Sequence, residues 1–295
     1  MTDPVSASLR CPKCRGKLKY SQKKRSYLCG VHGKVKEPLD IKQADKAVTV
    51  PLGRGVVVSA PDNFDLFLTS DWHCGSNVCD YKGLHSMIGR LQDTRSARMI
   101  IGGDQMEMTP PLHHDGGRES TCYPDEQIIR TSDALQKCAN RIDLIYSGNH
   151  GRARLSHVHV DPDLILAYTL GANYSTVPTV VQYKTPSGVI KIAGGHGKSG
   201  GKNGLLEVER LRNIFPGCDL YHLGHNHQLF AEQAGAMEFD EDGFEHWSGT
   251  WFCRTGSFMQ YAHYARFAVM APQPTGYLVA KIRKGKIADV EVVKA

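Results

Sequence analysis

The sequence of 295 residues contains no long apolar run. No stretch approaches the roughly 20 consecutive apolar residues that a membrane-spanning helix needs, so we expect no membrane partner. The first residues, Met1–Arg10, lack the apolar stretch of a secretory signal peptide. Internal repeats and low-complexity tracts are missing too. These absences predict a cytoplasmic (intracellular) protein, and the length allows one or two domains with a full core.

The nine cysteines do not suggest a disulfide framework, because their number is odd and they are clustered. Such a pattern favours metal ligation and free thiols in a reducing compartment. The formal net charge of +6 is mildly basic. That charge permits an anionic polymer as a partner without requiring one.

Side chains that can bind a metal ion follow five short apolar runs, each of which is typical of a buried strand. The runs are Phe64–Ser70, Met99–Ile101, Ile142–Tyr146, Val189–Ala193 and Leu220–Leu223. They lead into Asp71-Trp72-His73, Gly102-Gly103-Asp104, Gly148-Asn149-His150, Gly194-Gly195-His196 and Gly224-His225-Asn226-His227. Glycine beside these groups lets the backbone approach closely, and neutral imidazole is the commonest metal ligand. Because sites in α/β sheets lie beyond the carboxyl ends of strands, we expect these groups to converge.

Helical patterns separate the strand-like runs. In Tyr81–Ala97, the residues Leu84, Met87, Ile88 and Leu91 fall on one apolar face. Two more helices are expected over Pro124–Asn140 and Asn203–Phe215. Further strands are expected at Val56–Ser59 and in a closing hairpin of Tyr277–Ile282 with Ala288–Val293. Strands that alternate with helices predict the α/β class.

The ordered motif series resembles that of the calcineurin-like metallophosphoesterases, over about residues 63–295. The resemblance implies a four-layer β-sandwich flanked by helices that holds two divalent metal ions. By the same resemblance, one ion is held by Asp71, His73, Asp104 and His227. Asp104 would bridge to a second ion, which is completed by Asn149, His196 and His225. His150 would approach the phosphate as the catalytic residue.

Two such ions would neutralise a phosphate and activate a water molecule for attack on phosphorus. Carboxylate, amide and imidazole ligands suit Mn, Fe or Zn, and the sequence leaves the choice open. His150 would protonate the leaving oxygen or, when charged, stabilise the transition state.

The chain departs from the family pattern at two points. Gly151 stands where many members carry Asp or Glu, so another group must orient His150. No arginine stands within Gln105–Glu107, directly after Gly103-Asp104, which weakens the protein-phosphatase interpretation. Arg152 could bind phosphate instead. We also consider Arg118 and His114, from the long insertion Thr109–Pro124, as substrate-binding residues. Lys198 is a further candidate, or simply a solvated side chain.

Near the amino terminus, Cys11, Cys14, Cys29 and His32 form a pattern that suits one structural Zn²⁺. The alternative is a redox Cys-x-x-Cys or unrelated thiols. Residues 1–40 therefore resemble a zinc ribbon, residues 41–62 a linker, and residues 63–295 the phosphoesterase domain. The basic run Lys17–Arg25 could contact phosphates or form a solvated hairpin tip.

The sequence favours a phosphodiesterase or nuclease that acts on nucleic acid through a metal-activated hydroxide. One alternative is a phosphomonoesterase for phosphoprotein or nucleotides, and another is a nucleic-acid-binding module with a weak site. The natural substrate, DNA versus RNA, the polarity of cleavage and the oligomeric state are left open.

Overall fold

The computed structural model describes residues 49–109, 120–155, 159–198, 203–239, 241–261 and 271–295, with short strands between residues 9 and 40. Those strands are β1 (Leu9–Arg10), β2 (Leu18–Ser21), β3 (Ser26–Cys29), β4 (Gly33–Val35) and β5 (Leu39–Asp40). β2, β3 and β4 form an antiparallel sheet, and β1 pairs with β5. Cys11, Cys14 and His32 lie outside the described residues, and the side chain of Cys29 is not described. The zinc site therefore stays a prediction.

The first large sheet has six strands in the order β10-β9-β8-β7-β16-β17. Its parallel part consists of β7 (Phe64–Thr69), β8 (Ala97–Ile101), β9 (Ile142–Tyr146) and β10 (Asn173–Ser175). The antiparallel hairpin of β16 (Gly276–Arg283) and β17 (Lys286–Lys294) closes the sheet against β7. The expected closing hairpin is thus confirmed.

The second large sheet has six strands in the order β14-β15-β13-β12-β11-β6. These are β14 (Leu229–Phe239), β15 (Glu245–Thr255), β13 (Leu220–Leu223), β12 (Gly188–Gly195), β11 (Thr179–Thr185) and β6 (Val56–Ser59). β12, β13 and β15 run parallel, whereas β11 and β14 run antiparallel to β12 and β15. β6 has its predicted bounds and pairs with β11. The limits of the linker and of the two domains remain predictions.

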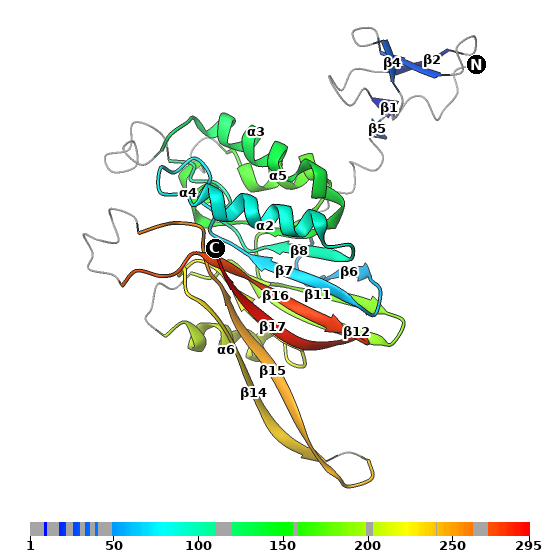
Figure 1. The fold of residues 1–295 in the computed structure, drawn as a ribbon, viewed down its shortest axis with the longest axis vertical. Helices are drawn as coiled ribbons and strands as arrows, with labels where there is room; N and C mark the ends of the chain where they lie inside the picture. Colours follow the sequence, from blue (N-terminus) through cyan, green and yellow to red (C-terminus); the bar gives the residue numbers. More distant parts are fainter. Residues whose placement is uncertain are drawn as a thin grey trace.

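Helices cover the outer face of each large sheet (Figure 1). They are α2 (Tyr81–Asp93), α3 (Pro124–Leu135), η2 (Gln136–Arg141), α4 (Asn149–Leu155), α5 (Pro162–Leu170) and α6 (Gly204–Ile214). α2, α3 and α5 pack on the first sheet, and α6 packs on the second. No helix among the described residues has the length and apolar character to cross a membrane.

Alternating side chains on the strands separate the core into layers. Leu66 and Leu68 of β7 join the core between the two sheets, where they meet side chains such as Tyr183 and Ile192. Phe67 points the other way, into the core beneath α2. The predicted inward face of α2 is confirmed, because Leu84, Met87, Ile88 and Leu91 are all buried. Two mixed sheets flanked by helices give the predicted α/β sandwich its four layers.

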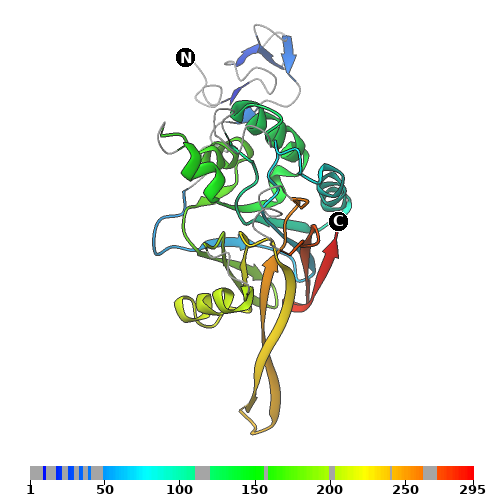
Figure 2. The same ribbon diagram turned by 90° about the vertical axis from the view of Figure 1, so that its left-hand side faces the viewer.

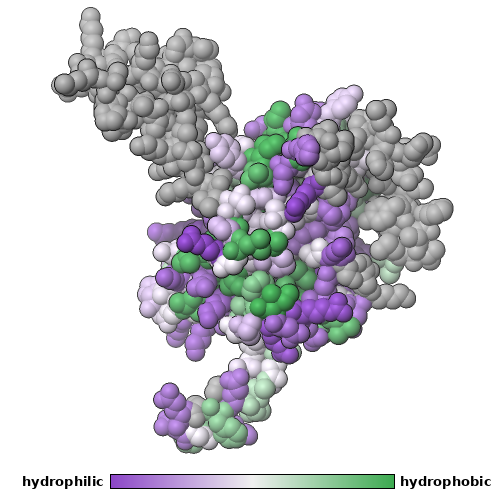
Figure 3. All heavy atoms as spheres, turned by 180° about the vertical axis from the view of Figure 1, so that it is seen from behind, coloured by the Kyte–Doolittle hydropathy of each residue, from purple (hydrophilic) through white to green (hydrophobic). Residues whose placement is uncertain are grey.

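β14 and β15 continue beyond the body as a two-stranded arm (Figures 1 and 2). These strands were not predicted from the sequence. Met237, Phe239, Phe244 and Trp247 are exposed near the end of the arm. Figure 3 shows hydrophobic and hydrophilic side chains side by side on this surface.

Candidate metal centre

The loops that carry the predicted ligands meet at the carboxyl ends of β7, β8, β9, β12 and β13. The backbone N–H groups of Asp71 and His73 donate to the carbonyl oxygens of Gly103 and Asp104, at 2.9 and 3.1 Å. The two large sheets are joined here as well, because the backbone N–H of His225 donates to Asp71 Oδ2 at 2.8 Å. Both sheets therefore contribute to one site, as the strand-end pattern predicted.

The first cluster consists of Asp71, His73 and His227, whose ligand atoms all lie within 4.8 Å of one another. Asp71 Oδ1 is 4.0 Å from His73 Nε2 and 3.5 Å from His227 Nε2. Asp71 Oδ1 and His73 Nε2 are fully buried, and neither has a hydrogen-bond partner. Buried polar atoms are rarely left unsatisfied. These two atoms lie 4.0 Å apart and can both accept a shared ligand, so the cluster fits a cation.

The second cluster consists of Asp104, His196 and His225, again within 4.8 Å of one another. His196 Nε2 lies 3.1 Å from Asp104 Oδ2, 2.9 Å from Asn149 Oδ1 and 3.2 Å from His225 Nδ1. Nδ1 of His196 faces the carbonyl oxygen of Gly102 at 2.8 Å, which turns Nε2 toward the cluster. The four side chains expected around a second ion therefore lie together.

The backbone at these positions adopts an unfavourable conformation. Asp71, His73, Asp104, His225 and His227 have φ angles of 53°, 51°, 52°, 73° and 60°. A residue other than glycine in this left-handed region costs about 1–3 kcal/mol, and such residues gather at functional sites. Five of the seven expected ligands share this conformation, which supports a functional rather than a packing role.

Electrostatics around the second cluster favour a cation. Burial alone would lower the pKa of the His196 imidazole, but attraction by the Asp104 carboxylate raises that pKa to about 10. Burial likewise opposes ionisation of Asp71, yet the charge of His196 lowers the pKa of Asp71 to about 2. The negative charge of Asp104 and Asp71, which favours a proton on His196, would also attract a metal ion. Metal binding would release that proton.

Glu107 is the main site residue that the sequence analysis missed. Its Oε2 atom lies 2.9 Å from His73 Nδ1 and 3.3 Å from His150 Nδ1. Burial would raise the pKa of Glu107, but hydrogen bonds from His150 and His73 hold it well below its usual range. Nδ1 of His150 also lies 3.2 Å from the backbone carbonyl oxygen of Glu107, so the side chain and the backbone of Glu107 together orient His150 in place of an acid at position 151.

Arg254 is buried and braces the loop that carries His225 and His227. Its guanidinium donates from Nη1 to the Gly224 carbonyl oxygen at 2.7 Å and from Nε to the Gly204 carbonyl oxygen at 3.0 Å. Nη2 pairs with Glu207 Oε2 at 2.6 Å. Arg254 thus ties the start of α6 to the metal loop.

The remaining predicted site residues have mixed outcomes. His150 lies beside the centre, with its ring centroid 4.4 Å from that of His73. It also forms a third group of possible ligands with His73 and Asp104. Arg152 is exposed on α4, and Lys198 is exposed after Gly197. His114 and Arg118 lie outside the described residues, so their roles stay predictions.

Comparisons with known proteins give the fold a context. No family model and no curated protein matches the sequence. Vps29 from Entamoeba histolytica, solved with Zn²⁺, is similar at 13% identity and TM-score 0.43, covering 78% of this chain and 98% of that one. Vacuolar protein sorting 29 from Cryptosporidium parvum is similar at 15% identity and TM-score 0.41, covering 79% of this chain and 97% of that one.

A protein of Streptococcus pneumoniae TIGR4, described as a predicted phosphoesterase, is similar at 12% identity and TM-score 0.35. The match covers 80% of this chain and 100% of that one. Likeness at this level assigns neither a family nor an activity. The geometry of the metal centre therefore carries the proposed function.

Proposed function

We propose that the chain is a metal-dependent phosphoesterase with two divalent ions, of the calcineurin-like type. The position of Asp104 between the two clusters carries this proposal. Its carboxylate lies within 4.8 Å of ligand atoms of His73 on one side and of His196 and His225 on the other. A carboxylate in that position suits a bridge between two ions, each completed by imidazoles.

Two ions held there would supply positive charge for a phosphate and would lower the pKa of water. The chain's own residues set the geometry around them. His73 and His196 are each fixed through Nδ1, so that Nε2 faces the cluster. Such outer hydrogen bonds orient the ring and raise its basicity.

His150 is the proposed proton donor to the leaving oxygen. Its backbone N–H donates to Asp104 Oδ1 at 2.7 Å, which anchors the start of α4 to the centre. With Nδ1 directed at Glu107, the charged ring would present Nε2–H to the substrate. A positioned histidine of this kind contributes about 10²–10⁴-fold to a rate.

For the substrate, we propose a phosphodiester in nucleic acid. The basic run Lys17–Arg25 provides charge for contacts with several phosphates, which a small ester could not use. The absence of an arginine after Gly103-Asp104 speaks against a protein phosphatase. A nucleotide phosphomonoesterase is the rival within the same chemistry.

The test is hydrolysis by Mn²⁺-loaded protein of p-nitrophenyl phosphate, bis(p-nitrophenyl) phosphate and single- and double-stranded DNA. We expect turnover of the diester and of DNA that exceeds turnover of the monoester. Faster turnover of the monoester would favour the phosphomonoesterase. No turnover of any substrate, with metal bound, would contradict the proposed function.

A further inference from the structure

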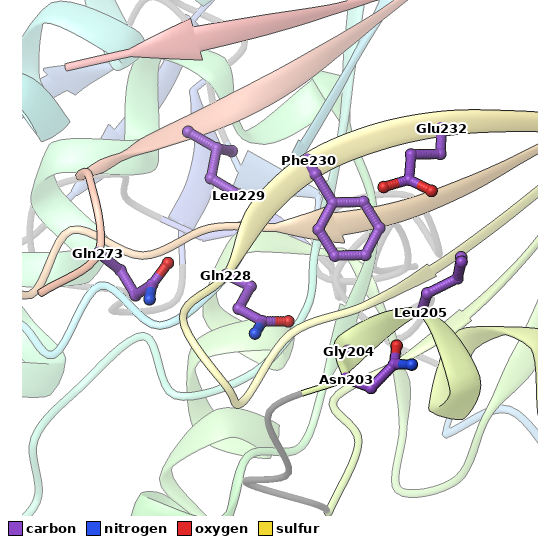
Figure 4. Close-up of a pocket in the computed structure, with 8 residues that line it drawn as sticks. All are labelled: Asn203, Gly204, Leu205, Gln228, Leu229, Phe230, Glu232 and Gln273. Atoms are coloured by element: carbon purple, nitrogen blue, oxygen red, sulfur yellow. The ribbon is translucent and has the colours of Figure 1, made fainter. Parts of the chain in front are cut away.

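A cavity of about 360 Å³ opens at the base of the arm, beside the metal loop (Figure 4). Three structural parts contribute to its wall: the start of α6, the start of β14 and the segment before β16. The lining residues are Asn203, Gly204, Leu205, Gln228, Leu229, Phe230, Glu232 and Gln273. Figure 4 shows the ring of Phe230 between Gln228 and Glu232, with Leu205 on the side of α6.

The metal loop and the cavity wall are continuous. Gln228 directly follows His227, and adjacent Cα atoms are about 3.8 Å apart. The side chain of Gln228 is held by Asn226, whose Nδ2 donates to Gln228 Oε1 at 3.1 Å. A Cβ atom at Gly204 would lie 1.9 Å from Gln228 Oε1, so only glycine leaves room for this amide. A phosphate ester bound at the metals could therefore place an attached group in the cavity.

The chemistry of the wall excludes a second phosphate as the ligand. The described lining residues include no lysine or arginine, and the carboxylate of Glu232 would repel an anion. The wall instead offers an aromatic ring, the amides of Asn203, Gln228 and Gln273, and one carboxylate. A flat, uncharged, polar ring meets these groups best. Aromatic side chains stack on bases, amides pair with base edges, and a carboxylate accepts from an exocyclic amino group.

We propose that this cavity binds the base of a nucleotide unit whose phosphate lies at the metal centre. The inference rests on the proposed function and narrows its substrate class to nucleotide esters. Phe230 supplies the stacking surface, and the amide and carboxylate groups supply the polar contacts. A plain phosphodiester would use the metal centre alone.

Binding is tested by calorimetry with adenosine 5′-monophosphate and ribose 5-phosphate, each added to the Mn²⁺-loaded full chain. We expect the wild-type protein to bind the nucleotide more tightly than the sugar phosphate. Phe230→Ala should weaken nucleotide binding between about fivefold and about 150-fold, the range for loss of one stacked base. Ribose 5-phosphate binding should not change. Phe239→Ala removes an exposed aromatic side chain from the same strand and should leave both affinities at wild-type levels.

A kinetic measurement separates this inference from the proposed function. The ratio of kcat/KM for thymidine 5′-p-nitrophenyl phosphate to that for methyl p-nitrophenyl phosphate, a plain diester with the same leaving group, should fall in Phe230→Ala. Glu232→Gln, which keeps the shape of the side chain, should weaken binding of adenosine 5′-monophosphate, whose base carries an exocyclic amino group, without affecting the plain diester.

Equal binding of the two phosphates by the wild-type protein would overturn the base site, even if both esters are hydrolysed. Equal relative losses of kcat/KM for the two esters in Phe230→Ala would also overturn the base site. Phenylalanine-dependent nucleotide binding without any hydrolysis would overturn the proposed function and leave the base site standing. If neither binding nor hydrolysis occurs, both are wrong.

Discussion

Glu107 Oε2 lies 2.9 Å from Nδ1 of His73, although the two residues are 34 positions apart in the chain. The contact is buried on both sides. A carboxylate behind a ligating imidazole fixes its tautomer and orientation, and loss of such a partner costs about 10–100-fold in metal affinity. Glu107 also faces His150, so one carboxylate serves both a ligand and the proposed proton donor.

Replacing Glu107 by glutamine should therefore weaken metal binding and slow turnover together. We expect the Mn²⁺ concentration for half-maximal activity to rise about 10–100-fold, with a lower kcat at saturating metal. The measurement is a Mn²⁺ titration of diester hydrolysis. Glu126→Gln, at an exposed helix ion pair, is the control. A normal titration curve for Glu107→Gln would show that Glu107 does not act through the metal.

Replacing His150 by asparagine should lower kcat about 10²–10⁴-fold and leave the metal content unchanged. The loss should shrink for esters with good leaving groups, because these need no proton. Activity against a series of aryl esters tests this. The exposed His85 gives the control His85→Asn, which should behave as wild type. Metal loss in His150→Asn would instead mean that His150 is a ligand.

Arg254→Lys should destabilise the fold and the metal loop. Lysine cannot reproduce the three directed contacts of the guanidinium to Gly204, Gly224 and Glu207. Lysine keeps the positive charge, so the loss comes from buried carbonyl oxygens left without a donor, which costs about 1–3 kcal/mol and would be detected by urea unfolding. Arg130→Lys affects an exposed pair and should leave the stability at the wild-type level. An Arg254→Lys protein as stable as the wild type would contradict this role.

Glu291 links β17 to α2 and β16, and its contribution to stability should depend on pH. Arg90 contacts both carboxylate oxygens, at 3.1 and 2.9 Å, and Lys281 lies 2.9 Å from one of them. The hydrogen bonds from Arg90 lower the pKa of Glu291 to about 2, from 4.5. A depressed folded-state pKa means that the stabilisation is complete above pH 4.5 and is lost as the pH falls toward 2.

Glu291→Gln should therefore lower the free energy of unfolding by up to about 1 kcal/mol at pH 7, since the pair is partly exposed. The difference from wild type should shrink as the pH falls below 4.5. Urea unfolding of both proteins at pH 7, 4 and 3 measures this. A difference that stays constant over this range would mean that the charge of Glu291 does not contribute.

The ligand positions could be predicted because strand ends place adjacent motifs on one edge of a sheet. Asp71, Asp104 and His225 each follow a short apolar run, and the structure brings them together with the other four expected ligands. That these groups bind metal stays a prediction. Glu107 could not be found in this way, because its role depends on a turn after Asp104 that no periodicity encodes.

Several elements could not be predicted from the sequence, among them β11, α5 and the arm, and the last two were missed for different reasons. α5 is apolar on most sides, so no helical face stands out, although Asp161 caps its start and Gly171 ends it. The arm is long and largely exposed, so its strands lack the alternation that burial of one face imposes. The zinc site before residue 33 would be formed by side chains outside the described residues. The zinc ion that would hold these side chains together is itself a prediction.

Manganese binding by the full chain and its Asp104→Asn variant, measured by equilibrium dialysis with diester hydrolysis on the same samples, tests the two-metal centre most directly. We predict two bound Mn²⁺ ions for the wild type, fewer than one for Asp104→Asn, and no turnover by the variant. Asp133→Asn, at an exposed carboxylate, should match the wild type. An Asp104→Asn protein that binds as much manganese as the wild type and hydrolyses the diester equally fast would contradict the account.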